Sequence, residues 1–254
     1  MREIMSRIIT LLSDFGSVYP AQMKGVILER VPDAVLVDIA HDIPPQDIRA
    51  GAFALMITAR HFPSGTVHLA VVDPTVGTKR LGIVIKSGGH LFVGPDNGLL
   101  VPAARSLGRP EAHAITRRFE ASPTFHGRDI FAPIAALLAG GESPDRFGPG
   151  VVPVDLDFGS AQVSEDRVEA RVVYVDRFGN LVLNLEQVPS GDLRLAGRVL
   201  RKVRTYADAG GIEPLITIGG HGHAEVAVNQ GSAAELFGLA GGDRIVLERS
   251  NCLE

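Results

Sequence analysis

The first 74 residues alternate short apolar runs with amphipathic stretches, and this alternation limits the possible fold more than any other feature. The amphipathic stretches carry apolar residues at helical spacing, as in Met23, Val26, Ile27 and Val31. Strand, helix, strand, helix, strand in this order is typical of a parallel sheet with helices on both faces. We therefore predict strands over residues 8–14, 34–40 and 66–74, and helices over residues 20–31 and 44–62.

The same domain continues with a hairpin and two further helices. Residues 81–98 contain two apolar runs separated by a Ser-Gly-Gly turn, which is a hairpin signal. Residues 99–108 and 129–141 have the composition of helices. In sheets of this kind ligands bind beyond the carboxyl ends of the strands, and Asp14 and Asp73 are placed at such ends.

The composition changes around residues 142–165, which are rich in Gly, Pro and Asp, and we predict a linker over residues 151–165. Beyond it, runs of strand length separated by turn residues predict an all-β domain over residues 166–254, either a small barrel or a sandwich. The predicted fold class is an α/β N-terminal domain (residues 1–150) with a central, mostly parallel sheet, plus an all-β, barrel-like C-terminal domain.

Charge and composition argue against several kinds of partner. A net charge of −4 argues against nucleic acid and anionic membranes, which both favour a basic face. The sequence predicts no transmembrane helix, because no run approaches the roughly 18 apolar residues that one needs. The single cysteine, Cys252, has no partner for an internal disulfide, which favours a reducing, cytoplasmic location.

Two motifs in the first domain carry carboxylates at strand ends. Asp14, in LLSDFGS, is placed either to cap a helix or to accept hydrogen bonds from a ribose diol. Asp73 and Arg80, in VVDPTVGTKR, form either a loop salt bridge or a charge-assisted pair that orients the carboxylate for chemistry. These residues alone leave both alternatives open.

Two further motifs gather polar residues at the ends of elements. FHGRDIFAP brings His126 together with an arginine and an aspartate before a helix. DRFGNLVLN places Asp176, Phe178 and Asn180 at alternating positions, where the ring can stack on a flat base while the acid and amide bind its polar edges. For the first motif, the alternative is a surface histidine that only forms a hydrogen bond with the neighbouring acid. For the second motif, it is a strand with a glycine bulge.

The segment GGHGHAEVAV contains His221, His223 and Glu225, which we expect on one face of a strand. This spacing permits a metal site, but no further histidine or cysteine cluster accompanies it, so we expect no metal. The sequence also lacks the short motifs of P-loop, dinucleotide-binding, zinc-protease and serine-hydrolase sites.

Seven segments, in order from about residue 8 to residue 248, together resemble the S-adenosyl-L-methionine (SAM) hydroxide adenosyltransferases, which are SAM hydrolases related to fluorinases and chlorinases. The segments are SDFG…KGVI, HDIPPQDIRAGAFAL, VVDPTVGTKR, GPDNGLL, FHGRDIFAP, DRFGNLVLN and NQGSAAELFGL…GD. The resemblance implies an α/β domain, a C-terminal β-barrel and a homotrimer with SAM between neighbouring subunits. It also implies that water or hydroxide attacks C5′ of the ribose and releases adenosine and L-methionine.

Carried over motif by motif, the resemblance implies a catalytic set of Asp73, Arg80 and His126. It places Asp14 on the ribose hydroxyls and makes SAM the substrate, with no cofactor. The other substrate contacts that it implies are Asp176 and Asn180 at the methionine end, Phe178 in the pocket wall, and Asn229, Gln230 and Ser232 near the adenine.

The resemblance also bears on the choice of nucleophile. In the halogenating relatives a tyrosine stands at the position of Asp73, which implies that Asp73 selects hydrolysis. A carboxylate repels a halide, whereas it accepts a hydrogen bond from water. Because the sulfonium departs as a neutral thioether, the enzyme needs mainly to position and partly desolvate a water molecule.

The sequence leaves two other functions open. A metal-dependent phosphohydrolase would use Asp14, Asp73 and Asp96 at the strand ends, although these residues do not cluster within one motif. A sensor that binds SAM or adenosine without turnover would need the same binding residues.

Overall fold

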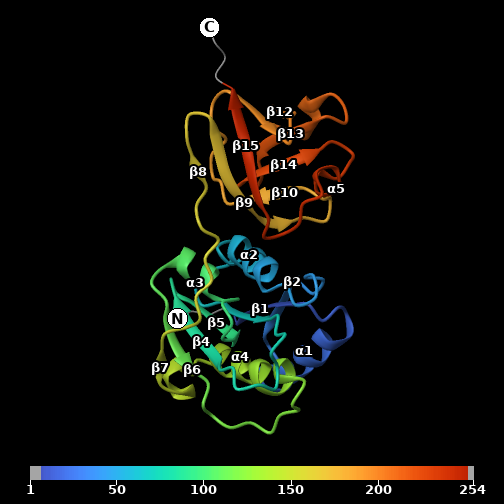
Figure 1. Ribbon diagram of the computed structural model, residues 1–254. Helices are drawn as coiled ribbons and strands as arrows, with labels where there is room; N and C mark the ends of the chain where they lie inside the picture. The colour runs from blue at the N-terminus through green and yellow to red at the C-terminus, as the bar shows by residue number, and fades with distance from the viewer. Residues whose placement is uncertain (1–6, 251–254) are drawn as a thin grey trace, which may run out of the picture. The chain divides into compact units, whose positions relative to one another are not determined.

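The computed structural model describes residues 7–250, so Cys252 lies outside the described residues. The chain forms two compact units, Met1–Leu156 and Asp157–Glu254 (Figure 1). The division between them falls inside the segment 151–165 that the sequence predicts as a linker. Among the described residues, no helix is long and apolar enough to cross a membrane.

The first unit contains a seven-stranded sheet in the order β2-β1-β3-β5-β4-β6-β7. Strands β2, β1, β3 and β5 are parallel neighbours, whereas β4 runs antiparallel to both β5 and β6. Five strands therefore share one direction, which confirms the predicted, mostly parallel sheet. The strands are β1 (Ile8–Ser13), β2 (Val35–Ala40), β3 (Val67–Val71), β4 (Gly82–Ser87), β5 (His90–Pro95), β6 (Glu111–Ala114) and β7 (Gly150–Val151).

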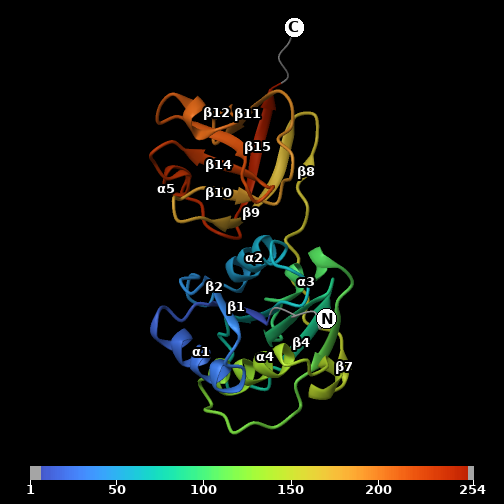
Figure 2. The ribbon, with the colours of Figure 1, turned by 180° about the vertical axis from the view of Figure 1, so that it is seen from behind.

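Helices pack on both faces of this sheet, as the alternating sequence predicts (Figures 1 and 2). α1 (Val18–Arg30) packs with α4 (Ala132–Ala139) on one face, and α2 (Ile48–Ala59) packs with α3 (Val101–Leu107) on the other. The buried core under α1 and α4 includes Ile9, Leu11, Met23, Ile27, Val67, Leu69, Phe131, Ile134 and Leu138.

Two helix starts differ from the prediction. α2 begins at Ile48 rather than at residue 44, because the side chain of Asp47 caps it by accepting the N–H of Ala50 at 2.9 Å. Gln46, with φ of 66°, breaks the helical path before the cap. The helix predicted over 129–141 is an α-helix only from Ala132, and a π-helical turn, Gly127–Phe131, precedes it.

The second unit is a closed seven-stranded barrel. Its strands follow the order β10-β14-β13-β12-β11-β15-β9, and β9 pairs again with β10, which closes the barrel. This confirms the barrel-like all-β domain and decides against a sandwich. The elements are β8 (Gln162–Val163), which adds to β9, then β9 (Arg167–Val175), β10 (Leu181–Leu183), β11 (Asp192–Leu195), β12 (Arg198–Lys202), β13 (Pro214–Ile218), β14 (Ala224–Val228), α5 (Ala233–Phe237) and β15 (Arg244–Ser250).

One of the runs of strand length in the second domain, RVLRKVRTYA (residues 198–207), is a strand over only half of its length. It leaves the strand conformation after Lys202, and Tyr206–Ala209 forms a 3₁₀ turn. A capping box explains this turn, because Thr205 and Asp208 each bond the other's backbone N–H.

Candidate active site

Asp14 and Asp73 lie just beyond the carboxyl ends of neighbouring strands. β1 and β3 pair in parallel with Ser13 opposite Val71, so both carboxylates lie at one edge of the sheet. Asp14 Oδ2 accepts the backbone N–H of Gln46 at 2.8 Å. Asp14 therefore bonds the loop after β2, and it does not cap α1, whose first turn has no side-chain cap.

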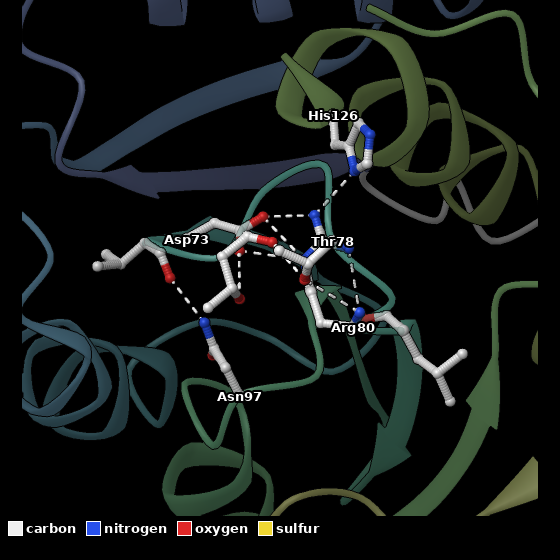
Figure 3. A network of polar contacts seen from close by, with 8 residues as sticks. Asp73, Thr78, Arg80, Asn97 and His126 are labelled. Atoms are coloured by element: carbon white, nitrogen blue, oxygen red, sulfur yellow. Dashed lines mark hydrogen bonds and ion pairs between the residues drawn. The ribbon is translucent and has the colours of Figure 1, made fainter. Parts of the chain in front are cut away.

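Asp73 and Arg80 form a buried ion pair (Figure 3). Arg80 Nε donates to both carboxylate oxygens, at 3.0 Å to Oδ1 and 2.9 Å to Oδ2, and Nη2 also donates to Oδ2. The two side chains are only 3% (Asp73) and 10% (Arg80) exposed, so the pair is unlike an ordinary exposed loop salt bridge. Several charge-assisted hydrogen bonds fix the direction of the carboxylate.

The loop between Asp73 and Arg80 turns back on itself because of its glycine. Gly77 has φ of 78°, in the left-handed region, and a Cβ there would lie 2.7 Å from the carbonyl oxygen of Pro123. Thr78 Oγ1 donates to the carbonyl of Thr75 at 2.8 Å and tightens the turn. This close packing brings Arg80 back to the carboxylate at the strand end.

The turn GPDNGLL supports the same strand end from β5. Asn97 Nδ2 donates at 2.8 Å to the carbonyl of Val72, the residue before Asp73 (Figure 3). Asp96 Oδ1 accepts the N–H of Val154 at 2.8 Å. Both side chains of this turn thus have structural hydrogen bonds, and Asn97 anchors the backbone next to the candidate catalytic carboxylate.

His126 joins the pair through Arg80, whose Nη2 lies 2.9 Å from His126 Nδ1. A guanidinium can only donate, so Nδ1 accepts and the ring carries its proton on Nε2. Burial, and then the positive charge of Arg80, lower the pKa of His126 below its usual value. The geometry and the pKa direction agree on a neutral imidazole.

The three side chains form one chain of hydrogen bonds, Asp73–Arg80–His126, with no net charge. Asp73 offers a carboxylate acceptor, and His126 offers an Nε2–H donor. Both kinds of group are needed to orient a water molecule. The arrangement therefore presents a negatively charged acceptor and a neutral donor at the edge of the sheet.

The neighbours of His126 in FHGRDIFAP hold its loop in place. Arg128 pairs with Asp129 through two contacts, at 2.6 Å (Nε to Oδ1) and 3.0 Å (Nη2 to Oδ2), and Asp129 Oδ2 also accepts the N–H of Ser122 at 2.8 Å. The hydrogen bond from Arg128 is the main cause that lowers the pKa of Asp129. The Arg128 guanidinium lies 4.9 Å over the ring of Phe125. These contacts fix the turn from which His126 projects.

The barrel unit contains a cavity of about 580 Å³, within the usual size range of small-molecule sites. Five of the residues that the resemblance implies line it together, although they come from segments 50 residues apart. The lining consists of Asp176, Phe178, Asn180, Tyr206, Val228, Asn229, Gln230 and Gly231.

Asp176 organises the turn that carries Phe178 and Asn180 into this cavity. Its Oδ1 accepts the N–H of Phe178 and of Asn180, each at 2.9 Å, and its Oδ2 accepts Asn180 Nδ2 at 2.8 Å. Phe178 is 75% exposed, so its ring forms an open wall. Three accepted bonds leave room for about one more, since a carboxylate has about four acceptor directions.

Ser232, also implied by the resemblance, is not part of the cavity lining. Its hydroxyl accepts the N–H of Glu235 at 3.1 Å and caps α5. A Cβ on Gly179 would lie 2.2 Å from the Ser232 hydroxyl, and Gly179 has φ of 78°. The glycine of DRFGN is therefore required by this close approach, and the strand bulge that the sequence also allows is not needed to explain it.

Tyr206 lines the cavity, but no motif in the sequence pointed to it. The only available signal was the capping-box spacing of Thr205 and Asp208, which predicts a turn and not a binding residue. The turn places Tyr206 beside Asn229 and Gln230 only after the barrel closes.

The prediction that His221, His223 and Glu225 share one face of a strand is wrong. β14 begins at Ala224, and both histidines lie in the preceding turn. His221 Nε2 pairs with Glu225 Oε2 at 3.0 Å. Within residues 7–250, no group of three or more His, Cys, Asp and Glu side chains could hold a metal ion.

The fold and these sites define a class: two-unit proteins with an α/β sheet that holds a polar centre at its edge and a β-barrel with a cavity of small-molecule size. Residues 9–148 match the SAM hydroxide adenosyltransferase N-terminal domain, and residues 170–246 match the C-terminal domain of the same family. The chain belongs to the SAM hydroxide adenosyltransferase family, which confirms the resemblance seen in the sequence.

Individual proteins agree with this assignment. A curated (R)-S-adenosyl-L-methionine hydrolase from Thermus thermophilus is 41% identical over 251 residues, covering 93% of this chain and 97% of the relative. A protein of the same name from Salinispora tropica is 40% identical over 252 residues, covering 93% of this chain and 96% of the relative. An uncharacterized conserved protein from Thermotoga maritima, solved by crystallography, has a TM-score of 0.85 at 33% identity and covers 95% of this chain and all of its own.

Proposed function

We propose that this protein hydrolyses SAM to adenosine and L-methionine, with water attacking C5′ of the ribose. The observation that carries the proposal is the buried Asp73–Arg80–His126 chain at the sheet edge, in a member of this family. The curated relatives are named as hydrolases of the (R) sulfonium epimer, so we propose that epimer as a substrate.

The proposed step needs orientation more than acid or base strength. The water oxygen forms a bond to C5′ while the C5′–S bond breaks. The electron pair of the C5′–S bond stays on sulfur, which leaves as the neutral thioether of methionine. Asp73 accepts a hydrogen bond from the water, and His126 donates its Nε2–H to the water oxygen. One proton is released to solvent overall, and Arg80 holds both partners in place.

Substrate binding is proposed to use both units. Asp14, with Oδ2 held by the backbone of Gln46, binds the ribose hydroxyls through its remaining acceptor capacity. In the barrel cavity, Asp176 and Asn180 contact the methionine end, where the carboxylate has one acceptor direction left for an ammonium group. Phe178 forms the wall, and the segment Asn229–Ser232 lies near the adenine.

We also propose the homotrimer that the resemblance implies. In it, the α/β unit of one subunit and the barrel unit of a neighbouring subunit supply the two halves of each site. What supports this proposal is that the candidate residues fall into two separate sets, one in each compact unit.

The reaction is tested by incubating purified protein with each sulfonium epimer and separating the products by chromatography. Parallel reactions contain added chloride, fluoride or a metal chelator. We expect adenosine and methionine in equal amounts, independent of halide and of chelator. A halogenated nucleoside would contradict the assigned role of Asp73, loss of activity with chelator would favour the phosphohydrolase, and intact bound SAM would make the protein a sensor.

A further inference from the structure

A network of four polar side chains lies next to Asp14 in the α/β unit. Ser13 Oγ lies 2.7 Å from His41 Nδ1, and His41 Nε2 lies 3.0 Å from Asp38 Oδ1. Lys24 Nζ, from α1, donates to Asp38 Oδ2 at 2.6 Å. Ser13 is fully buried, so it cannot act as the nucleophile of a serine hydrolase, although a histidine and an aspartate follow it in the network. The network therefore needs another explanation.

An irregularity in the pairing of β1 with β2 creates this network. The register is regular as far as Leu11 and Asp38, after which β2 contains one extra residue. The next position in the shifted register brings His41 beside Ser13, at the carboxyl ends of both strands. Without the extra residue, Ala40 would occupy that place and could not bond the hydroxyl. Irregularities of this kind redirect a side chain next to a site.

The network also determines which nitrogen of His41 donates. Burial would raise the pKa of Asp38, but the hydrogen bonds from Lys24 and His41 outweigh it and hold that pKa below its usual value. An ionised carboxylate only accepts, so His41 Nε2 carries a proton. In the neutral ring, Nδ1 then accepts the hydroxyl proton of Ser13. Ser13 Oγ in turn accepts the backbone N–H of Phe15 at 3.4 Å, so the hydroxyl is bonded on both sides.

His41 holds the backbone on both sides of Asp14. Its ring bonds Ser13, the residue before Asp14, and its carbonyl accepts the N–H of Gly16, two residues after Asp14, at 2.8 Å. Gly16 has φ of 68°, in the left-handed region, which allows the backbone to turn there. Asp14 Oδ2 accepts the N–H of Gln46 at 2.8 Å, which leaves Oδ1 for a ligand. The loop after β2 thus fixes both the backbone and one carboxylate oxygen of Asp14.

We propose that His41 is a positioning residue that sets the direction of Asp14 toward the ribose hydroxyls, with Asp38 and Lys24 holding its ring. The proposal rests on the proposed function, since it takes Asp14 to bind the ribose. A carboxylate that is already fixed loses little conformational freedom on binding. It also rejects a sugar without hydroxyls, because its oxygen is then left unpaired. His41 therefore controls selectivity for the sugar through Asp14.

Adenosine and 2′,3′-dideoxyadenosine test this proposal without turnover, because they share the base and differ only in the two ribose hydroxyls. We expect the wild type to bind adenosine about tenfold or more tightly than the dideoxynucleoside, as measured by calorimetry. D14A should reduce this preference to near one. Equal affinities in the wild type would overturn the proposal, because Asp14 would then not recognise the hydroxyls.

Two substitutions of His41 separate positioning from a general loss of stability. The amide of H41N takes the place of Nδ1 and keeps the bond to Ser13, whereas the longer H41Q reaches toward Asp38 and loses that bond. We expect H41N to keep the adenosine preference within about twofold of the wild type, and H41Q and S13A each to lower it about fivefold. The matched control, H61Q, changes a histidine at an exposed position and should have no effect.

The double variant S13A/H41Q decides whether His41 acts through Ser13. If it does, the adenosine preference of the double variant is no lower than that of the more affected single variant. Additive losses would overturn this route. Equal losses in H41N and H41Q, the pattern of a purely structural role, would overturn the proposal, as would an unchanged preference in both H41Q and S13A.

Hydrolysis of SAM by the wild type is measured separately. A preference for adenosine that follows this pattern in a protein without hydrolysis would contradict the proposed reaction and support the positioning role. Hydrolysis with the preference unchanged in H41Q and S13A would do the reverse. The failure of this proposal and the failure of the proposed function are therefore distinguishable.

Discussion

A single hydrogen bond, from Arg80 Nη2 to His126 Nδ1, determines what His126 can offer a substrate. Because Nδ1 accepts, the free nitrogen is a donor, and His126 in this state is not a base. Asp73 is then the acceptor of the three side chains. We therefore propose that most of the selectivity for water over halide comes from one carboxylate, whose direction Arg80 fixes.

Replacement of Asp73 should separate chemistry from binding. We expect D73A and D73N to lower the rate of hydrolysis by about 100-fold or more, since D73A removes the acceptor for the water and D73N replaces the carboxylate with a weaker, neutral acceptor that no longer forms an ion pair with Arg80. The dissociation constant for SAM should stay within about threefold. Single-turnover kinetics and calorimetry on the same preparations measure both quantities. D96N, at the neighbouring strand end, keeps its acceptor oxygen and serves as the control; equal losses of rate and affinity in D73N would contradict the assignment.

Removal of the Arg80 charge should change the titration of His126. Burial and the Arg80 charge both lower the pKa of His126, so the R80M variant should have a higher His126 pKa, closer to the usual value. Nuclear magnetic resonance titration of the ring protons measures this shift directly. K79M removes the adjacent exposed charge and should leave the titration unchanged. A His126 pKa that stays the same in R80M would contradict the hydrogen bond from Arg80 Nη2 to His126 Nδ1.

The resemblance alone identified Asp73, Arg80 and His126 as one set. The motifs by themselves left an ordinary loop salt bridge between Asp73 and Arg80 open as the alternative. What the resemblance could not supply was the tautomer, because that depends on which ring nitrogen meets Arg80 across 46 residues of sequence. Tyr206 escaped prediction for a similar reason. Its hydroxyl donates to Glu225, a buried residue on another segment that only the closed barrel brings within reach.

At the scale of elements, the α/β sheet contains a buried histidine stack. His68 on β3 shares hydrogen bonds with Thr10 on β1 (2.8 Å) and with His90 on β5 (3.1 Å), and its ring stacks on Phe92 at 4.8 Å between centroids. Burial, and then the proximity of His90, lower the pKa of His68 to about 3. The folded sheet therefore requires a neutral His68.

This stack should make the α/β unit less stable in mild acid. The folded pKa of His68 lies below the unfolded value of 6.5, so its full contribution to stability is present above pH 6.5. It declines as the pH falls below that value, because the unfolded state then binds the additional proton, by about 1.4 kcal/mol per pH unit.

Urea unfolding between pH 7.5 and about pH 5 measures that slope. H68L should flatten it, whatever its own stability at neutral pH, whereas H61Q, at an exposed position, should keep it. An unchanged slope in H68L would show that another group causes the acid sensitivity.

The elements that the sequence predicted well are long and strongly patterned, such as β1, β3 and α1. Among those it missed, β6 and β11 have four residues each, which is too short for a periodic signal to stand out. The start of α2 was misplaced because Pro44 and Pro45 look like a helix start, whereas the Asp47 cap determines it. Local hydrogen bonds of this kind compete with the proline signal and decide the boundary.

At the scale of the whole molecule, each compact unit holds one set of candidate site residues. The change of composition around residues 142–165 indicated a division into an α/β unit and an all-β unit. The closure of the barrel could not be predicted from the sequence, because the pairing of β9 with β10 is one of several pairings that the same strands allow. The proposed homotrimer assigns the two sets in each site to different subunits.

Complementation between two inactive variants tests that assembly. D73A lacks the proposed catalytic carboxylate in the α/β unit, and N180A lacks an amide in the barrel cavity. If neighbouring subunits supply the two halves, co-expressed chains form mixed trimers in which about a quarter of the sites have both halves intact. We expect hydrolysis to return to about that fraction of the wild-type rate. No recovery in verified mixed oligomers would place both halves of the site in the same chain.

The most direct test of the central claim is to run the reaction in water labelled with heavy oxygen and weigh the products by mass spectrometry. Attack of water on C5′ predicts that the label appears in the 5′-hydroxyl of adenosine and that methionine carries none. D73N should form the same labelled adenosine at a much lower rate. Unlabelled adenosine, or label in an amino acid product, would contradict water attack at C5′ and with it the role assigned to Asp73, Arg80 and His126.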